Sequence, residues 1–334
     1  MTENTTLGLE SAMSHDQLVI IKTFTIITSI LGTLGNTLTI LAIMKGKLYQ
    51  KSSFLFILNL SICNLIHCVI FHPLLAIQSF HGIWTYSKWS CIAFAYGLFS
   101  NLGTELWGYT CITLNRYICV VQHHIYSRIY GDKRIIIGTL AFTWLFYPIL
   151  FLFPLTEIWG HFVYAPQKLI CYPFADYNCN GFCLFIYMIA IASTAPVILF
   201  CYGGIIHKYI KTQRKVGLGR DKSSVRSSGN EVTGVKKTDS ERHRALSELR
   251  MAFTILAVIA VFAGCRMPFM ILYLYDPSMS KVNPLIHTVL IYFGSCSNWI
   301  NPIIYSFSNK TIFSSIKNIF NSWKKTLVVQ TEKS

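Results

Sequence analysis

Apolar residues are gathered along this chain into seven long blocks, which shorter polar segments separate. Each block is long enough to cross roughly 30 Å of hydrocarbon as a helix of about 20 residues. The blocks cover approximately residues 18–44, 53–78, 89–121, 135–155, 182–207, 249–275 and 284–308. This pattern predicts an all-α membrane protein, in which a bundle of seven transmembrane helices forms one domain over residues 18–308.

The segments outside these blocks predict three further features. Residues 1–17 form an N-terminal tail, and residues 212–242, which are rich in Gly, Ser and Lys and lack aromatics, predict a flexible third inner loop. Residues 309–334 predict a short amphipathic helix followed by a cytoplasmic tail. Its apolar stripe consists of Ile312, Phe313, Ile316, Ile319 and Phe320, and its basic residues are Lys310, Lys317, Lys324 and Lys325. We expect this helix to lie on membrane lipids.

Composition agrees with a membrane protein, and the position of the charges predicts its orientation. The chain is 53% hydrophobic and 13% charged, about half the charged fraction of a soluble domain. Of its 29 Lys and Arg, 24 lie at the ends of the first, third, fifth and seventh blocks or just beyond them. The positive-inside rule places these segments in the cytosol and the N-terminus outside. Because the basic residues have no domain of their own, the net charge of +15 does not predict nucleic-acid binding.

The N-terminal tail predicts how the chain enters the membrane. Its first 17 residues carry acidic residues and no base, so they lack the positively charged start of a cleaved signal peptide. We expect the first helix to serve as the insertion signal of a multi-pass plasma-membrane protein. Asn4 begins an Asn-Thr-Thr sequence on the predicted outer side, which makes it a candidate for N-glycosylation.

Short motifs lie at the inner ends of two predicted helices. Asn115-Arg116-Tyr117 closes the third block, and Asn301-Pro302 with Tyr305 closes the seventh. Other motifs lie at Gly35-Asn36, Asn59-Leu60-Ser61, Trp84, Trp144 and Pro268. Over roughly residues 30–320, this combination resembles the rhodopsin-like G-protein-coupled receptors. Asn-Arg-Tyr in place of Asp-Arg-Tyr is similar to the melatonin receptors and to the insect moody and trapped-in-endoderm receptors.

The resemblance implies an ion pair that holds the resting state. Arg116 would pair with Glu248 on the sixth helix, as the corresponding residues do in family members. Since Asn115 replaces the family's acid, we expect Arg116 to have no local competitor for this contact. The simpler interpretation of Arg116 is one more positive charge at the inner end of a helix.

The resemblance also assigns the moving parts of the switch. Tyr202 and Tyr305 match tyrosines that meet near the arginine in the family's active state. Pro268 would act as the pivot of the sixth helix, because a proline removes a backbone hydrogen bond and bends the helix. An agonist would favour the state in which the inner end of this helix swings outward.

Eleven cysteines do not predict a disulfide framework, because most lie within apolar blocks, where Cys packs as a small hydrophobe. Cys91 opens the third helix and Cys171 lies in the second outer loop, and the resemblance implies a disulfide between them. Cys179 and Cys183 could form a further bridge or remain free. No cysteine has metal-ligand spacing with histidine, and we expect neither a metal nor a cofactor.

The middle of the bundle departs from the family pattern at linked positions. Asn64 stands where the family keeps a sodium-binding aspartate, Glu105 replaces a serine, and Arg266 replaces a tryptophan. Since a buried carboxylate and a buried guanidinium are each costly alone, we expect Arg266 to pair with Glu105 and to act as a tethered cation. Asn64, Ser297, Asn298 and Asn301 would complete the polar cluster. Alternatively, Arg266 faces a wet ligand cavity and binds an anionic group of the ligand.

The ligand is predicted only by class. Leu98 stands where amine receptors keep an aspartate, so a biogenic amine is not expected. The predicted pocket residues are apolar or aromatic, namely Phe94, Leu98, Phe99, Leu102, Met270, Tyr273 and His287. They favour a neutral, lipidic or aromatic ligand, although the packing of any membrane bundle explains them equally well. Ser295 stands where opsins carry their retinal lysine, which excludes a light receptor of that kind.

We therefore predict a receptor that activates heterotrimeric G proteins, with arrestin and a receptor kinase as further partners. One alternative is a receptor-fold protein that acts through arrestin or ligand sequestration. A transporter is less favoured, because it would need several intramembrane charges along a path. An enzyme is not expected, since the sequence shows no paired acids, Cys/His nucleophile or His-rich metal motif.

Overall fold

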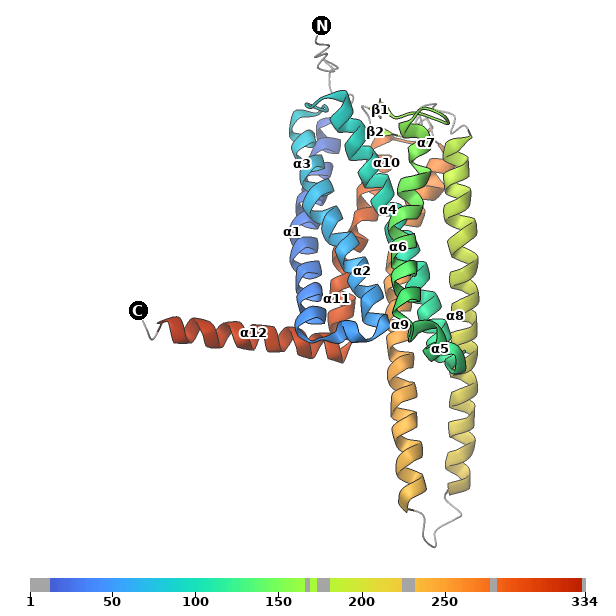
Figure 1. Ribbon diagram of the computed structural model, residues 1–334. Coiled ribbons are helices and arrows are strands. Elements are labelled where there is room, and N and C mark those ends of the chain that lie inside the picture. Colours follow the sequence, from blue (N-terminus) through green and yellow to red (C-terminus); the bar gives the residue numbers. More distant parts are fainter. Residues whose placement is uncertain (1–12, 166–168, 173–180, 224–231, 277–280, 332–334) are drawn as a thin grey trace.

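The computed structural model describes residues 13–165, 169–172, 181–223, 232–276 and 281–331. Asn4, Cys179 and the side chain of Cys183 lie outside these residues. Figure 1 shows an upright helical bundle whose last helix, α12 (Lys310–Thr331), turns across the bundle axis at one end. We call that end the C-terminal face, and we call the end where α1 (His15–Lys45) begins the N-terminal face.

Seven helical crossings build the bundle in the described part of the chain, which confirms the predicted fold. In chain order they are α1 (His15–Lys45), α2 with α3 (Ser52–Ile66 and His72–His81), α4 (Lys88–Val120), α6 with α7 (Lys133–Leu150 and Leu152–Leu155), α8 (Phe182–Ser223), α9 (Val232–Tyr275) and α10 with α11 (Pro284–Phe293 and Ser297–Ser308).

Shorter elements divide or join these crossings. They are a 3₁₀ turn (Leu48–Gln50), a π-helical turn (His67–Phe71), α5 (His123–Tyr130), β1 (Val163–Ala165), β2 (Ile170–Tyr172) and a second 3₁₀ turn (Gly294–Cys296). The two strands form an antiparallel hairpin in which Tyr164 lies opposite Cys171. The π-helical turn divides the second crossing, and the second 3₁₀ turn divides the seventh.

Local sequence signals explain where several helices begin and end. Ser14 and Gln17 form a capping box before α1, and Ser87 caps α4. Asn283 caps α10, which then starts with a proline. The second crossing ends at Gly82, whose φ of 72° lies in the left-handed region that favours glycine.

The fifth and sixth crossings continue as helices well beyond the predicted membrane blocks. In Figure 1, α8 and α9 project past the C-terminal face as two long rods. The prediction of a flexible loop over 212–242 is therefore wrong for residues 212–223 and 232–242, which are helical. The chain has no proline between Pro196 and Pro268. A helix already formed in the bundle can therefore extend without paying again for nucleation.

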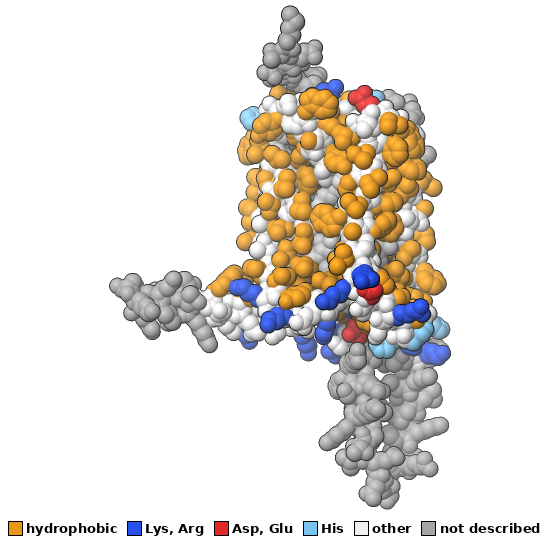
Figure 2. All heavy atoms as spheres, viewed as in Figure 1, with side chains coloured by type: hydrophobic (Ala, Val, Ile, Leu, Met, Phe, Trp, Pro, Cys, Tyr) orange, Lys and Arg blue, Asp and Glu red, His pale blue; other side chains and the backbone are white. Residues whose placement is uncertain are grey.

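Apolar side chains cover the sides of the bundle, as a lipid environment requires. Figure 2 shows this apolar surface, with Lys and Arg gathered near the C-terminal face. By length and hydropathy, five helices among the described residues qualify as membrane spans. The third crossing, which carries polar side chains along one face, and the seventh crossing, which is divided at Gly294, are not among these five helices.

The helix α12 is amphipathic, as predicted. Ile312 and Ile319 are buried against the bundle, whereas Phe313 remains 52% exposed. The ammonium of Lys45 on α1 lies 5.9 Å from the centre of the Trp323 ring, which attaches α12 to the first crossing.

Two apolar clusters fill the bundle, one toward each face. The N-terminal cluster includes Leu98 and Tyr273, and the C-terminal cluster includes Ile112 and Tyr305. Polar side chains lie at the level between them, among them Glu105. The fold thus presents two candidate regions for function, the polar layer in the middle and the helix ends at the C-terminal face.

Candidate functional site

Arg116 is the centre of a contact that joins α4 to α9 at the C-terminal face. Its side chain is fully buried, and Nη1 donates to Glu248 Oε2 at 3.0 Å. Nη1 also lies 3.1 Å from Met251 Sδ, one turn further along α9. Cys119 Sγ donates to the same Glu248 oxygen at 3.4 Å. The structure therefore brings the two predicted partners together.

Asn115 remains a local partner of Arg116, contrary to our expectation that the arginine lacks one. Its Oδ1 accepts from Arg116 Nη2 at 2.6 Å and from Nε at 3.2 Å. Ser53 Oγ donates to the same oxygen at 3.2 Å, and Asn115 Nδ2 donates to Ser52 Oγ at 3.2 Å. An amide has lost the charge of a carboxylate but keeps its acceptor oxygen. Asn115 therefore orients Arg116 and fastens α4 to the start of α2.

Close packing places the third residue of the motif, Tyr117. Its ring lies against Phe200 of α8, with 5.4 Å between ring centroids. A Cβ atom at Gly204, one turn further along α8, would come within 2.6 Å of the Tyr117 ring. The absence of a side chain at Gly204 thus lets α4 and α8 approach each other.

The two tyrosines assigned to the active state have separate environments. Tyr202 OH donates to the carbonyl of Ala252 on α9 at 3.3 Å. Tyr305 is fully buried, and its hydroxyl has no hydrogen-bond partner among the described residues. The structure thus shows no hydrogen bond between them, while the contact of Arg116 with Glu248 is closed.

Pro268 and Pro302 each lie inside a helix, α9 and α11 respectively. Pro302 packs closely against α1, because a Cβ atom at Gly35 would come within 2.9 Å of its ring. The glycine at position 35 therefore lets the Asn301-Pro302 turn of α11 approach the first crossing.

A chain of hydrogen bonds crosses the middle of the bundle from α9 through α4 to α11. Arg266 Nη2 donates to Glu105 Oε2 at 3.3 Å, and Tyr109 OH donates to Glu105 Oε1 at 3.1 Å. Asn301 Nδ2 then donates to Tyr109 OH at 2.6 Å. We call these four residues the central chain. Sequence reasoning missed Tyr109, although its position four residues after Glu105 places both on one face of α4.

The other predicted members of the polar cluster join it only in part. Ser297 Oγ donates to the carbonyl of Gly294 at 3.1 Å and lies 3.5 Å from Asn298 Oδ1. Asn36 Nδ2 donates to the Asn298 carbonyl at 2.9 Å, which ties α1 to α11. Asn64 is buried, and its amide has no hydrogen-bond partner among the described residues. Asn64 thus makes no hydrogen bond to the cluster among the described residues, and its membership stays a prediction.

The polar layer extends toward the N-terminal face through two histidines. His67 Nδ1 lies 3.2 Å from Asn101 Oδ1, and Asn101 lies one turn before Glu105 on α4. The rings of His67 and His72 are 4.8 Å apart across the π-helical turn. Both ring nitrogens of His72 are buried without a hydrogen-bond partner among the described residues.

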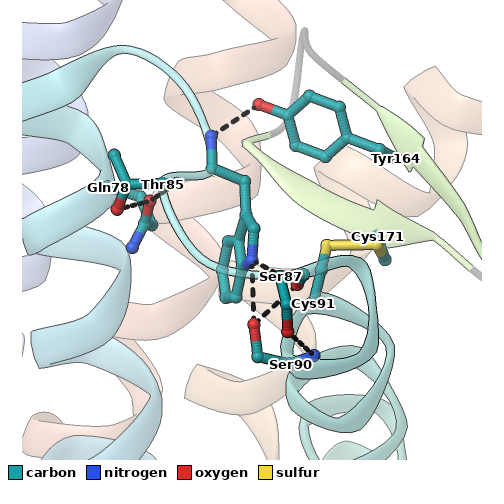
Figure 3. Close-up of a disulfide and its surroundings, with 8 residues drawn as sticks. Gln78, Thr85, Ser87, Ser90, Cys91, Tyr164 and Cys171 are labelled. Carbon is teal, nitrogen blue, oxygen red and sulfur yellow. Dashed lines mark hydrogen bonds between the residues drawn. A yellow bond between two sulfur atoms is a disulfide. The ribbon is translucent and has the colours of Figure 1, made fainter. Parts of the chain in front are cut away.

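A disulfide secures the N-terminal face, as Figure 3 shows. Cys91 at the start of α4 is bonded to Cys171 of β2, which confirms the predicted bridge. The Trp84 backbone N–H donates to Tyr164 OH of β1 at 3.0 Å. Burial raises the pKa of the Tyr164 hydroxyl, so it remains protonated at neutral pH. These contacts hold the hairpin over the mouth of the bundle.

Most predicted pocket residues belong to the N-terminal apolar cluster. Leu98 and Tyr273 are buried in it, and Phe99 and Leu102 pack against it. The rings of Tyr172 and Phe99 lie 5.2 Å apart, and those of Tyr172 and Tyr273 lie 6.1 Å apart. The disulfide-bonded hairpin therefore packs directly on the cluster. Met270 is half-buried on α9.

Two predicted pocket residues are engaged elsewhere. Phe94 packs between Phe71 and Trp84, at 5.5 and 5.3 Å between ring centroids. His287 Nε2 lies 3.1 Å from Asp276 Oδ2, and both side chains are buried near the N-terminal face. Sequence reasoning missed this Asp276 carboxylate. It engages one ring nitrogen of His287, while Nδ1 is buried without a hydrogen-bond partner among the described residues. The assignment of His287 to a ligand pocket stays a prediction.

Comparison with known proteins agrees with this architecture. The family described as "7 transmembrane receptor (rhodopsin family)" matches residues 35–305. The chain belongs to this family of receptors. The receptor has the same fold as squid rhodopsin, with a TM-score of 0.78 and 18% identity, over 96% of this chain and 90% of that structure.

Curated relatives come from the branch that the Asn-Arg-Tyr motif suggested. Protein trapped in endoderm-1 of Drosophila melanogaster is 26% identical over 87% of the receptor and 74% of that protein. The moody receptor of Drosophila pseudoobscura pseudoobscura is 25% identical over 93% of the receptor and 53% of that protein. Melatonin receptor type 1C of Xenopus laevis is 24% identical over 94% and 69%. The receptor therefore spans about half the length of the moody relatives.

Proposed function

We propose that the receptor binds an extracellular ligand from the N-terminal face and activates heterotrimeric G proteins at the C-terminal face. The contact of Arg116 with Glu248 is the observation that carries this proposal. It joins α4 to α9 through a fully buried guanidinium, so the ends of these helices can separate only when it breaks. The bias of Lys and Arg toward the segments at the C-terminal face supports an extracellular N-terminus.

The resting state would be held at two levels of the bundle. Arg116 and Glu248 hold the C-terminal ends of α4 and α9, and the central chain holds the middle of the same helices. Opening either contact exposes a buried charge unless a new partner replaces the lost one. An agonist that favours an outward position of α9, with Pro268 as the pivot, would release both.

The N-terminal apolar cluster supports a neutral, lipidic or aromatic ligand. It contains Leu98 and Tyr273 and is closed by the hairpin that carries Cys171. Arrestin and a receptor kinase are the further partners that we expect at the C-terminal face. The exposed apolar side of α12 supports contact with membrane lipids.

Basal signalling tests the proposal without a known ligand. The unmodified receptor, Arg116→Ala and Glu248→Ala are compared in cells across several G-protein readouts, with surface expression matched. We expect Glu248→Ala to raise a signal that Arg116→Ala abolishes. Silence of all three in every readout would reject G-protein activation and favour action through arrestin or ligand sequestration, which an arrestin-recruitment assay on the same cells distinguishes.

A further inference from the structure

The Arg266 guanidinium has donor capacity that its protein partners do not use. A guanidinium carries five N–H donors. Among the described residues, Arg266 makes one hydrogen bond, from Nη2 to Glu105, and its Nε is buried without a partner. Its side chain keeps 19% of its surface exposed, compared with 1% for Glu105. The accessible part of this ion pair therefore belongs to the Arg266 side chain.

Each oxygen of the Glu105 carboxylate, the ion-pair partner of Arg266, already accepts one hydrogen bond. Glu105 Oε1 accepts from Tyr109 at 3.1 Å, and Oε2 accepts from Arg266 at 3.3 Å. Tyr109 OH accepts in turn from Asn301 at 2.6 Å. A ligand group that only donates hydrogen bonds would have to share one of these oxygens with its present donor. A group that accepts them can instead use the unpaired N–H groups of Arg266.

The charge balance of the site favours an acceptor that carries no charge. Arg266 and Glu105 neutralise each other at 3.3 Å. The nearby imidazoles of His67 and His72 are buried and supply no fixed charge to balance a further anion. A carboxylate would therefore bring an unbalanced negative charge into a buried site, which costs far more than burying a neutral carbonyl.

Apolar side chains continue from this pair toward the N-terminal face. On α4, Leu98 and Leu102 precede Glu105 at the spacing of one helix face. On α9, Phe269 and Tyr273 follow Arg266 at the same spacing. All four belong to or pack against the N-terminal apolar cluster. A ligand body lying among them would have its inner end at Arg266.

We propose that the ligand is an apolar molecule whose inner end is an uncharged hydrogen-bond acceptor, such as an ester, amide or ketone carbonyl, and that Arg266 donates to it. This inference rests on the proposed function, because it names the ligand class of the same bundle. In the resting state Glu105 orients the guanidinium and balances its charge. The unpaired N–H groups distinguish a polar end from a plain hydrocarbon.

A set of four probes with the same medium-length alkyl chain tests this class. They are the methyl ester, the free carboxylate, the primary amine and the plain alkane. Binding is measured as the ligand-induced rise in unfolding temperature of the full-length receptor in lipid nanodiscs. Arg266→Lys keeps the charge for Glu105 but loses the planar fork of donors. Tyr147→Phe is the matched control, since it removes one buried hydroxyl that has no partner among the described residues and leaves both Arg266 and Glu105 intact.

We expect the ester to bind best and to lose about tenfold in affinity in Arg266→Lys, but not in Tyr147→Phe. Stronger binding of the carboxylate would overturn the inference in favour of an anion site. Equal binding of ester and alkane, or unchanged ester binding in Arg266→Lys, would overturn it as well. If Arg266→Lys does not fold, the double variant Glu105→Gln with Arg266→Gln, which removes both charges together, replaces it in the comparison.

This measurement separates the ligand class from the proposed signalling. The unfolding readout involves no G protein, so a receptor that binds the ester but stays silent in every G-protein assay would lose only the proposed coupling. A receptor that signals but does not discriminate among the four probes would lose only the inference about Arg266.

Discussion

The hydroxyl of Tyr109 offers the cleanest test of whether the central chain holds the resting state. Tyr109→Phe keeps the aromatic ring, which packs on Phe262 of α9 with 4.4 Å between ring centroids. It removes one oxygen that donates to Glu105 at 3.1 Å and accepts from Asn301 at 2.6 Å. Because the ring is unchanged, the variant removes two hydrogen bonds and almost no apolar packing.

The magnitude follows from these two bonds. A buried hydrogen bond to a charged group contributes about 1.5–3 kcal/mol, and one between neutral groups contributes about 1 kcal/mol. Glu105 keeps Arg266 as a partner, so we expect a net loss on the order of 2 kcal/mol if the bonds exist only in the resting state. This loss shifts the equilibrium toward the active state by about 30-fold. An active fraction of about one in a thousand would then rise to about 3%.

The assay is basal G-protein activation at matched surface expression, with the unfolding temperature measured in parallel. Tyr147→Phe is the control, because Tyr147 is a buried phenol on α6 whose hydroxyl has no partner among the described residues. We expect Tyr109→Phe to raise the basal signal and the control to leave it unchanged. A lower unfolding temperature with an unchanged basal signal would refute the reasoning, since the two bonds would then exist in both states.

Three further outcomes are expected from other parts of the molecule. Glu248→Gln should raise basal signalling only several-fold, because the Glu248 side chain is 37% exposed and water screens its charge. A basal signal equal to that of the unmodified receptor would show that the ion pair does not hold the resting state. Cys171→Ser opens a loop closed over 80 residues, at a cost of at most about 4.5 kcal/mol by the loop-entropy relation. It should lower the unfolding temperature by several degrees, as measured by thermal unfolding of the ligand-free receptor. Gly204→Val places a Cβ atom 2.6 Å from the Tyr117 ring and should lower the free energy of unfolding by about 1–3 kcal/mol. Gly203→Val is the control, because a Cβ atom there meets nothing within 4 Å, and it should leave the unfolding temperature unchanged.

Sequence reasoning could anticipate which charged residues meet in the bundle. A guanidinium or a carboxylate within an apolar helix is so costly alone that it must find a partner. Few candidates exist, so Arg266 and Glu105 could be paired before any coordinates were known, and their atoms lie 3.3 Å apart. The partner of Arg116 was instead predicted from the resemblance to known receptors, and the structure places Glu248 at 3.0 Å from it.

Neutral polar residues could not be assigned to partners by the same argument. A tyrosine in an apolar helix can pack through its ring without using its hydroxyl, so the sequence did not single out Tyr109 as a hydrogen-bonding residue. The structure does, because α11 places Asn301 Nδ2 2.6 Å from its hydroxyl. His287 looked like a pocket residue because the spacing along α10 does not show that the end of α9 places Asp276 beside it. Asn64 was expected in the polar cluster, but its amide makes no hydrogen bond among the described residues.

The sequence by itself determined the class of the protein, its seven crossings, the motifs at its helix ends and the charges that must be neutralised within the bundle. These follow from hydrophobic length and from the high cost of burying a charge, which any membrane fold must respect. The tertiary structure decided which acceptor each donor uses, how far α8 and α9 extend, and which aromatic rings pack on the hairpin. Such choices depend on differences of a few tenths of an ångström in the positions of helices that are far apart in the chain. No local pattern of residues determines these positions.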